Sequence, residues 1–165
     1  MAETYELIES DPGVADCEKL VGSGEREPEL HPALARWTAP LLRRVSLKMG
    51  ERFECRVSQL GLRSKHYGVL LLLKDGPLTQ VEIGRWLWID RTTMVALVDD
   101  LVRLALVERG RHPEDRRCHA VSLTEHGRRI LDVAEREVDE TEAECFAPLT
   151  QDERRQLKAL LTKLL

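Results

Sequence analysis

The sequence has few aromatic residues and no long apolar run. Phe, Trp and Tyr make up 4% of its 165 residues. The longest obvious apolar run, Val69 to Leu73, is far shorter than the roughly 20 residues that a membrane-spanning helix needs. The opening segment MAETYELIES is acidic and has no hydrophobic signal region. We therefore expect a protein that is neither exported nor inserted into a membrane.

The sequence also lacks paired cysteines and the common catalytic motifs. Its four cysteines form no CxxC pair and have no regular spacing, lying at Cys17, Cys55, Cys118 and Cys145. Dispersed thiols fit a reducing cytoplasm better than a disulfide framework, so we expect a cytoplasmic protein. There is no glycine-rich phosphate loop, nucleophile elbow or HExxH motif. These absences argue against an enzyme, and we expect no cofactor and no metal site.

The net charge of −4 conceals an uneven distribution. Residues 1–29 contain nine acidic residues against Lys19 and Arg26, a net charge of −7, which leaves about +3 for the rest. Several arginines gather late in the chain, at Arg103, Arg109, Arg111, Arg116 and Arg117. A local basic surface is enough for contacts with DNA phosphates, even in an acidic protein.

Residues 78–124 have the pattern of two short helices followed by a hairpin. Thr79 and Glu82 form a capping box at the start of the first helix. Val81, Ile83 and Leu87 suit the packed side of that helix. A turn follows at 88–90, in which Asp90 is a suitable N-cap for the second helix.

The second helix separates apolar from polar residues. The apolar ones follow helical spacing and are Met94, Leu97, Val98, Leu101 and Leu104. The other side carries Arg91, Thr92, Thr93 and Ala96. A helix with small, polar and cationic groups on its first two turns fits a DNA major groove. Arg91 can pair with guanine or phosphate, and the threonines can contact bases, phosphates or thymine methyl groups.

The predicted hairpin pairs residues 106–109 with 119–123. Their connection, 110–118, is too long for a two-residue turn and is expected to project as a loop. Arg116 and Arg117 lie at its tip, where an arginine can enter a narrow, electronegative minor groove. Arg109 and Arg111 are expected to meet phosphates, the alternative being ordinary solvated strand charges.

Together these elements resemble the MarR family of winged helix-turn-helix transcriptional regulators. The resemblance is carried by Ile89 to Val95, by Leu97-Val98-Asp99 and by Leu106 to Arg109. Its strongest part is Pro113-Glu114-Asp115-Arg116-Arg117 followed by Val121 to Gly127. It covers roughly residues 31–165 in element order. It implies a mainly α (α+β winged helix) fold, with N- and C-terminal helices that form a dimerisation region.

The domain organisation follows from this resemblance and from the apolar pattern. We expect an acidic extension over 1–30 (or an extra helix there that braces a dimer), a dimerisation helix over 31–60, the winged helix-turn-helix DNA-binding domain over 61–124, and C-terminal dimerisation helices over 125–165. Residues 32–59 are apolar on more than one face, with Pro40 marking a kink or a late helix start. Ser64 is a plausible N-cap for a helix over 65–73. In the last helix of the chain, an apolar stripe needs a partner to cover it and consists of Leu157, Leu160, Leu161 and Leu164.

The resemblance also bears on individual residues. It implies that Asp115 holds an arginine in position, and whether Arg116 or Arg117 enters the groove stays open. The family usually has glycine where this chain has Ala105, and many relatives have a basic residue where it has Ala96 and Leu97. An effector pocket between the dimer helices and the winged domain would involve, by position, Trp37, Leu41, His66, Tyr67, Trp86 and Trp88. The alternative for such residues is a place in the core.

We therefore expect a cytoplasmic homodimer that binds a double-stranded, pseudo-palindromic operator as a repressor and is released by a small-molecule effector. One alternative is a redox-sensing regulator that acts through Cys118, whose thiolate would be favoured by the neighbouring arginines. The other is a winged-helix module for protein interaction, which should lack the wing arginines that this chain has.

Overall fold

The computed structural model describes residues 30–111 and 119–165 of the chain. These residues form a mainly helical winged-helix fold with a two-stranded hairpin. In chain order the elements are α2 (Pro32–Ala35), α3 (Thr38–Ser58), α4 (Ser64–Leu72), α5 (Gln80–Leu87), α6 (Arg91–Arg103), β1 (Val107–Arg111), β2 (His119–Leu123), α7 (Glu125–Cys145) and α8 (Gln151–Thr162). No described helix is long and apolar enough to cross a membrane.

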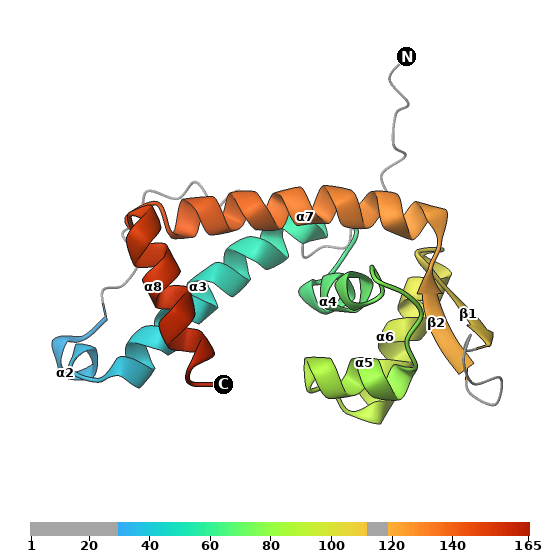
Figure 1. Ribbon diagram of the computed structural model, residues 1–165, viewed down its shortest axis with the longest axis horizontal. Helices are drawn as coiled ribbons and strands as arrows, with labels where there is room; N and C mark the ends of the chain where they lie inside the picture. The colour runs from blue at the N-terminus through green and yellow to red at the C-terminus, as the bar shows by residue number, and fades with distance from the viewer. Residues whose placement is uncertain (1–29, 112–118) are drawn as a thin grey trace, which may run out of the picture.

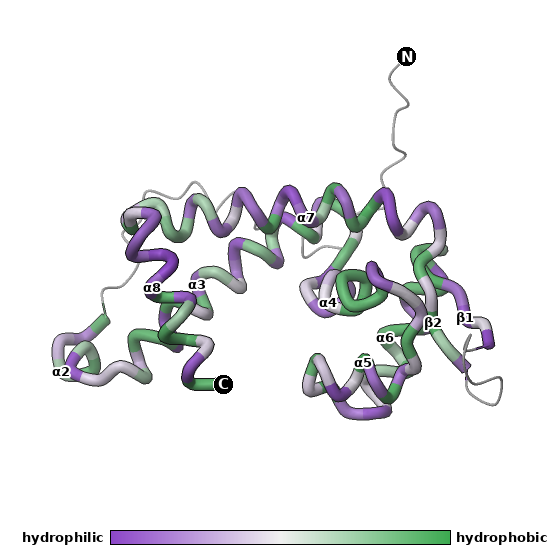
Figure 2. The backbone as a smooth tube through the Cα atoms, viewed as in Figure 1, coloured by the Kyte–Doolittle hydropathy of each residue, from purple (hydrophilic) through white to green (hydrophobic). Residues whose placement is uncertain are grey.

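The long helix α7 runs the length of the molecule, with one part of the fold near each of its ends (Figure 1). The winged-helix unit, made of α4, α5, α6, β1 and β2, lies below one end of α7. Helix α2, the start of α3 and helix α8 lie at the other end. Hydrophobic segments occur both inside the winged-helix unit and in the C-terminal part of α8 (Figure 2).

The hydrophobic core lies within the winged-helix unit and under the first half of α7. Its fully buried side chains come from several elements of that unit and from α7, and include Leu70, Ile83, Leu101, Val121 and Leu131. The expected apolar side of α6 is confirmed, because Met94, Leu97, Val98 and Leu101 are all buried. Burial of this side fixes which residues of α6 face outward.

The hairpin is antiparallel, with Val107 opposite Leu123 and Arg111 opposite His119. Strand β2 is also bonded to Leu78, in the segment before α5. The Leu78 N–H donates to the Val121 carbonyl oxygen at 3.1 Å, and the Val121 N–H donates back at 2.8 Å. These bonds tie the segment before α5 to the wing, so the helix-turn-helix and the hairpin are held in one unit.

Helices α3 and α7 are joined by a partly buried arginine. The Arg56 guanidinium donates to Glu137 at 3.2 Å, to Glu140 at 2.8 Å and to Glu144 at 2.5 Å. The arginine side chain is 19% exposed, and its hydrogen bonds to the three carboxylates offset the cost of burying its charge. The acidic stretch of α7 therefore faces a specific partner on α3.

Three local expectations are decided by this packing. The pattern predicts Val81 on the packed side of α5, but Val81 is 61% exposed. It lies two positions from Ile83, which places it on the opposite side of a helix. Ser64 is the first residue of α4 and not its N-cap, and its N–H donates to the Glu54 carboxylate at 2.9 Å. Pro40 stands in the first turn of α3, so the late helix start is confirmed.

Candidate nucleic-acid interface

Asp90 fixes the start of α6, the helix expected to enter DNA. One carboxylate oxygen accepts from the Thr93 N–H at 3.0 Å, and the other accepts from the Thr93 hydroxyl at 2.6 Å. These hydrogen bonds from the Thr93 side chain and backbone hold the pKa of Asp90 below its usual value. The expected N-cap is confirmed, and its negative charge is favoured by the helix dipole.

The same bonds distinguish Thr93 from its neighbours. Its hydroxyl donates within the protein and its side chain is only partly exposed, so Thr93 is the least available of the four expected contacts. Arg91, Thr92 and Ala96 are exposed, as expected. They lie on the side of α6 that faces away from the core, opposite its buried residues.

Sequence reasoning missed Val95 on this face. Val95 is 41% exposed and lies one turn after Arg91. Its apolar character suggests a core position, but its spacing from Met94 and Val98 could have shown that it points elsewhere. An exposed valine on a recognition helix offers methyl groups to a thymine methyl. The recognition surface, which we define as Arg91, Thr92, Val95 and Ala96, thus combines a cation, a hydroxyl and small apolar groups.

An open groove of about 750 Å³ runs between α5, the start of α6 and the hairpin. Three arginines line it, namely Arg85, Arg91 and Arg109, and no carboxylate is among its described lining residues. Sequence reasoning missed Arg85, since nothing in the spacing of α5 links it to the hairpin. The groove gives the underside of the winged-helix unit a positive character that suits a phosphate backbone.

The two strand arginines differ in their surroundings. Arg109 donates to the Asp99 carboxylate of α6 at 2.5 Å, so its guanidinium is held against the recognition helix. Arg111 is exposed at the end of β1, opposite His119. The other wing residues expected at the interface, Asp115, Arg116 and Arg117, lie outside the described residues.

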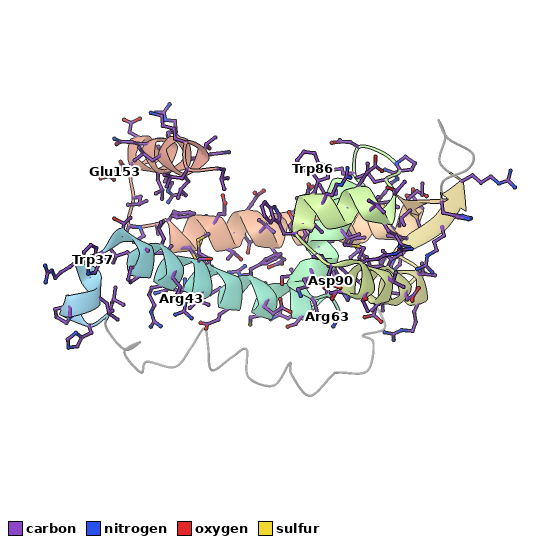
Figure 3. All side chains as sticks on the ribbon, turned by 90° about the horizontal axis from the view of Figure 1, so that it is seen from below. Trp37, Arg43, Arg63, Trp86, Asp90 and Glu153 are labelled. Atoms are coloured by element: carbon purple, nitrogen blue, oxygen red, sulfur yellow. The ribbon has the colours of Figure 1, made fainter. Side chains whose placement is uncertain are left out.

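The six residues expected at an effector pocket are not brought together. Trp37 lies at the end of the molecule away from the winged-helix unit, where Trp86 is found (Figure 3). Trp37 and Leu41 are exposed, as are Trp86 at 71% and Trp88 at 95%. Tyr67 is half-buried, and its ring meets the edge of Phe53 at a centroid distance of 5.2 Å. Tyr67 therefore has the core role that was the alternative.

His66 has a structural role in the described residues. It is buried, and its Nδ1 accepts from the Arg63 N–H at 3.2 Å. Its Nε2 lies 3.9 Å from the Asp100 carboxylate, which also pairs with Arg63 and Arg103. Burial, followed by the nearby Arg63 charge, lowers the pKa of His66 to about 4. At neutral pH this histidine is therefore uncharged.

The cysteines give limited support to a redox role. Cys118, the expected redox residue, lies outside the described residues, as does Cys17. Cys55 is buried in α3 and disulfide-bonded, which departs from the expectation of dispersed thiols. Cys145 is partly exposed, with the Arg52 guanidinium 3.9 Å from its sulfur. No group of metal ligands occurs among the described residues.

The fold and this surface define a winged helix-turn-helix DNA-binding protein, and comparison with known proteins identifies its family. A model of the MarR family matches residues 60–117. The transcriptional repressor CouR bound to a 23-mer DNA duplex is 34% identical, with 82% of this chain and 98% of that chain covered and a TM-score of 0.74. CouR from Rhodococcus jostii RHA1 bound to p-coumaroyl-CoA is 29% identical, with 81% and 95% covered and a TM-score of 0.74. A MarR mutant from E. coli complexed with operator DNA is 29% identical, with 81% and 94% covered and a TM-score of 0.69.

The chain belongs to the MarR family of winged helix-turn-helix transcriptional regulators. It is a DNA-binding regulator of transcription and not an enzyme. The resemblance recognised in the recognition helix and the wing is thereby confirmed.

Proposed function

We propose that this regulator is a homodimeric repressor that binds a pseudo-palindromic operator and is released from it by a small-molecule effector. The observation that carries the DNA-binding part is the recognition surface. Its residues are exposed, its helix is capped by Asp90, and its opposite side is packed into the core. A rigid, exposed and cationic helix start is what major-groove reading requires.

The homodimer is supported by apolar residues that the single chain leaves uncovered. We call this set the terminal helical surface. It consists of exposed residues at the end of α7 away from the winged-helix unit, namely Leu34, Trp37, Leu41, Leu42, Val45, Leu160, Leu161 and Leu164. Helix α8 has no buried residue at all. A short helix with an uncovered leucine stripe is not stable alone in water, and a second copy supplies the matching surface.

A twofold dimer would present two recognition surfaces to one face of DNA. Half-sites one helical turn apart require a separation of roughly 34–36 Å between the two recognition helices. The arginines of the groove would then face the phosphates that flank each half-site. An effector that changes this separation would weaken operator binding without touching the recognition surface.

Operator binding can be tested with DNA duplexes of random sequence. Selection from such duplexes should yield an inverted repeat, and titration should saturate at one dimer per duplex. A selected motif without twofold symmetry would contradict the dimeric part of the proposal. Failure to enrich any motif would contradict sequence-specific binding.

The dimer can be tested by changing two leucines of α8. Leu160→Glu with Leu161→Glu places charges on the terminal helical surface and should give a monomer by light scattering, because charges are costly in an apolar interface. The matched control is Lys158→Glu, an exposed residue of the same helix, which should leave the dimer intact. A double variant that remains dimeric at micromolar concentration would remove α8 from the interface.

The effector can be sought among the ligands of similar proteins. CouR from Rhodococcus jostii RHA1 was solved with p-coumaroyl-CoA, and an acyl-CoA thioester is the first class we propose to test. Binding should raise the melting temperature of the protein and release the operator duplex in a competition titration. A rise in melting temperature without operator release would identify a ligand but contradict its role as inducer.

A further inference from the structure

Trp88 occupies the turn between α5 and α6 in a conformation that its side chain does not favour. It ends α5 with φ 55° and ψ 41°, in the left-handed region. Its N–H closes the helix by donating to the Gly84 carbonyl oxygen. Glycine adopts this conformation readily, whereas a side chain brings its Cβ close to the following carbonyl oxygen.

The folded chain does not bury the indole of Trp88, so packing of the ring does not explain why tryptophan occupies this left-handed position. Trp88 is 95% exposed, so nearly all of its ring lies outside the protein. Its backbone role would be served as well by glycine. A large aromatic side chain that is strained and uncovered in the free protein indicates a contact with something else.

The position of Trp88 identifies that contact. It lies three residues before Arg91, directly before the recognition surface. Figure 1 shows that α5, the start of α6 and the end of the hairpin where β1 finishes and β2 begins share the lower edge of the molecule, away from α7. Trp88 therefore adjoins the recognition surface, which is the part of the molecule proposed to face DNA. It is not part of the terminal helical surface, which lies at the other end of α7.

The immediate surroundings of Trp88 have the chemistry of a phosphate contact. It lines a shallow cavity of about 360 Å³ together with Ser64 and the exposed Lys65 at the start of α4. Asp90 also lines this cavity, and hydrogen bonds from the Thr93 N–H and hydroxyl lower its pKa and keep its carboxylate charged, so a phosphate would approach Lys65 and not Asp90. The available groups are thus an indole N–H donor, a hydroxyl and an ammonium.

We propose that Trp88 is a DNA-positioning residue, whose indole packs on the operator sugar–phosphate backbone beside the recognition helix, with Lys65 paired to a phosphate. This inference rests on the proposed operator binding. Contacts of this kind fix the register of a protein on the duplex and carry no base preference. They would orient α6 at its first turn, where Arg91 and Thr92 reach the groove.

Intrinsic fluorescence can test the contact directly, because the chain has three tryptophans. A variant with Trp37→Phe and Trp86→Phe keeps Trp88 as its only tryptophan. Its emission should change on titration with operator duplex, and acrylamide should quench it less in the complex. The matched control keeps only Trp37, through Trp86→Phe and Trp88→Phe, and should show little response. If Trp88 emission and quenching do not change on addition of operator duplex, the proposal is overturned.

A second variant separates a DNA role from a structural role. Trp88→Gly relieves the left-handed strain, so its melting temperature should rise, while its operator affinity should fall. We expect a loss of roughly fivefold, the effect of removing one ordinary hydrogen bond. The loss should be similar on an unrelated duplex, because the contact is with the backbone. Lys65→Ala should also lower the operator affinity.

The outcomes of this inference and of the proposed function are distinguishable. If Arg91→Ala lowers operator affinity but Trp88→Gly does not, operator binding stands and the role of Trp88 is wrong. If Trp88 emission changes with protein concentration in the absence of DNA, its partner is a second copy and the proposal is overturned. If no variant affects binding to any duplex, the proposed function itself fails.

Discussion

Gly127 lies directly against the backbone of Leu106, and a Cβ on Gly127 would stand 1.9 Å from the Leu106 carbonyl oxygen. Thr124 holds the same joint together. Its hydroxyl donates to the Ala105 carbonyl oxygen at 2.7 Å, and its N–H donates to that of Leu106 at 3.1 Å. The start of α7 is thereby fixed to the exit of the recognition helix. The terminal helical surface and the recognition surface are connected through this contact.

Replacing Gly127 should therefore be costly. Gly127→Ala forces the Leu106 backbone to move, and we expect a loss of about 3 kcal/mol in the free energy of unfolding, the upper end for overpacking. The measurement is urea denaturation of the full chain. The matched control is Gly50→Ala in α3, where a Cβ meets nothing within 4 Å. That change should instead stabilise the protein by about 0.5–1 kcal/mol. Equal effects at the two sites would contradict the close contact.

Replacing Ala105 with glycine should stabilise the protein. It follows the C-cap of α6 with φ 55°, a conformation that costs a side chain about 1–2 kcal/mol. Part of the gain is offset by the greater entropy of glycine in the unfolded chain. We expect Ala105→Gly to stabilise by about 0.5–1 kcal/mol in thermal denaturation. Ala143→Gly, at an exposed position inside α7, should destabilise by a similar amount. A loss of stability at both positions would show that the left-handed turn is not strained.

His66 should make the protein sensitive to mild acid. Its pKa is about 4 in the folded chain and about 6.5 in the unfolded chain. The unfolded chain therefore binds the proton first as pH falls, so stability is lost between pH 6.5 and pH 4. The loss is about 3 kcal/mol for a buried histidine.

The control for this pH dependence is His66→Gln. Glutamine at the third position of α4 can still accept from the Arg63 N–H, as in an ordinary capping box, but it does not titrate. The difference in unfolding free energy between wild type and variant should grow smaller as the pH falls from about 7 to about 4. A constant difference over that range would show that His66 does not cause the acid sensitivity.

The recognition surface should contribute to affinity through Arg91. We expect Arg91→Ala to weaken operator binding by about 1–3 kcal/mol at fixed salt, measured by fluorescence anisotropy. The matched control is Arg129→Ala, an exposed arginine of α7 that pairs with Glu125 on its own helix. Removing it should leave affinity within error. Equal losses for the two variants would indicate a general charge effect and not a contact made by α6.

The wing should contribute through its tip. We expect Arg116→Ala with Arg117→Ala to lower operator affinity about tenfold at fixed salt, within the same range of about 1–3 kcal/mol, with dimerisation intact. The two single variants would show which arginine enters the minor groove. Unchanged operator binding in a gel-shift experiment would remove the wing from the mechanism.

Local signals in the sequence were enough to place the elements. Capping residues act within one turn of a helix, so Thr79 and Asp90 mark helix starts that the structure confirms. The period of buried residues in α6 also follows from sequence alone, because one face of a helix repeats every three or four positions. For the same reason the outward position of Arg91 and Thr92 could be predicted.

The sequence by itself therefore determined the recognition helix and the paired strands, because these depend on caps, periodicity and turns that lie close together along the chain. The class of fold followed from the resemblance to the MarR family. The sequence did not determine which side chains meet across elements. Only the tertiary structure decided that Arg109 is held by Asp99, that His66 is buried and that Trp88 is uncovered. Those outcomes depend on how helices and hairpin pack, since burial and pairing arise between residues far apart in sequence.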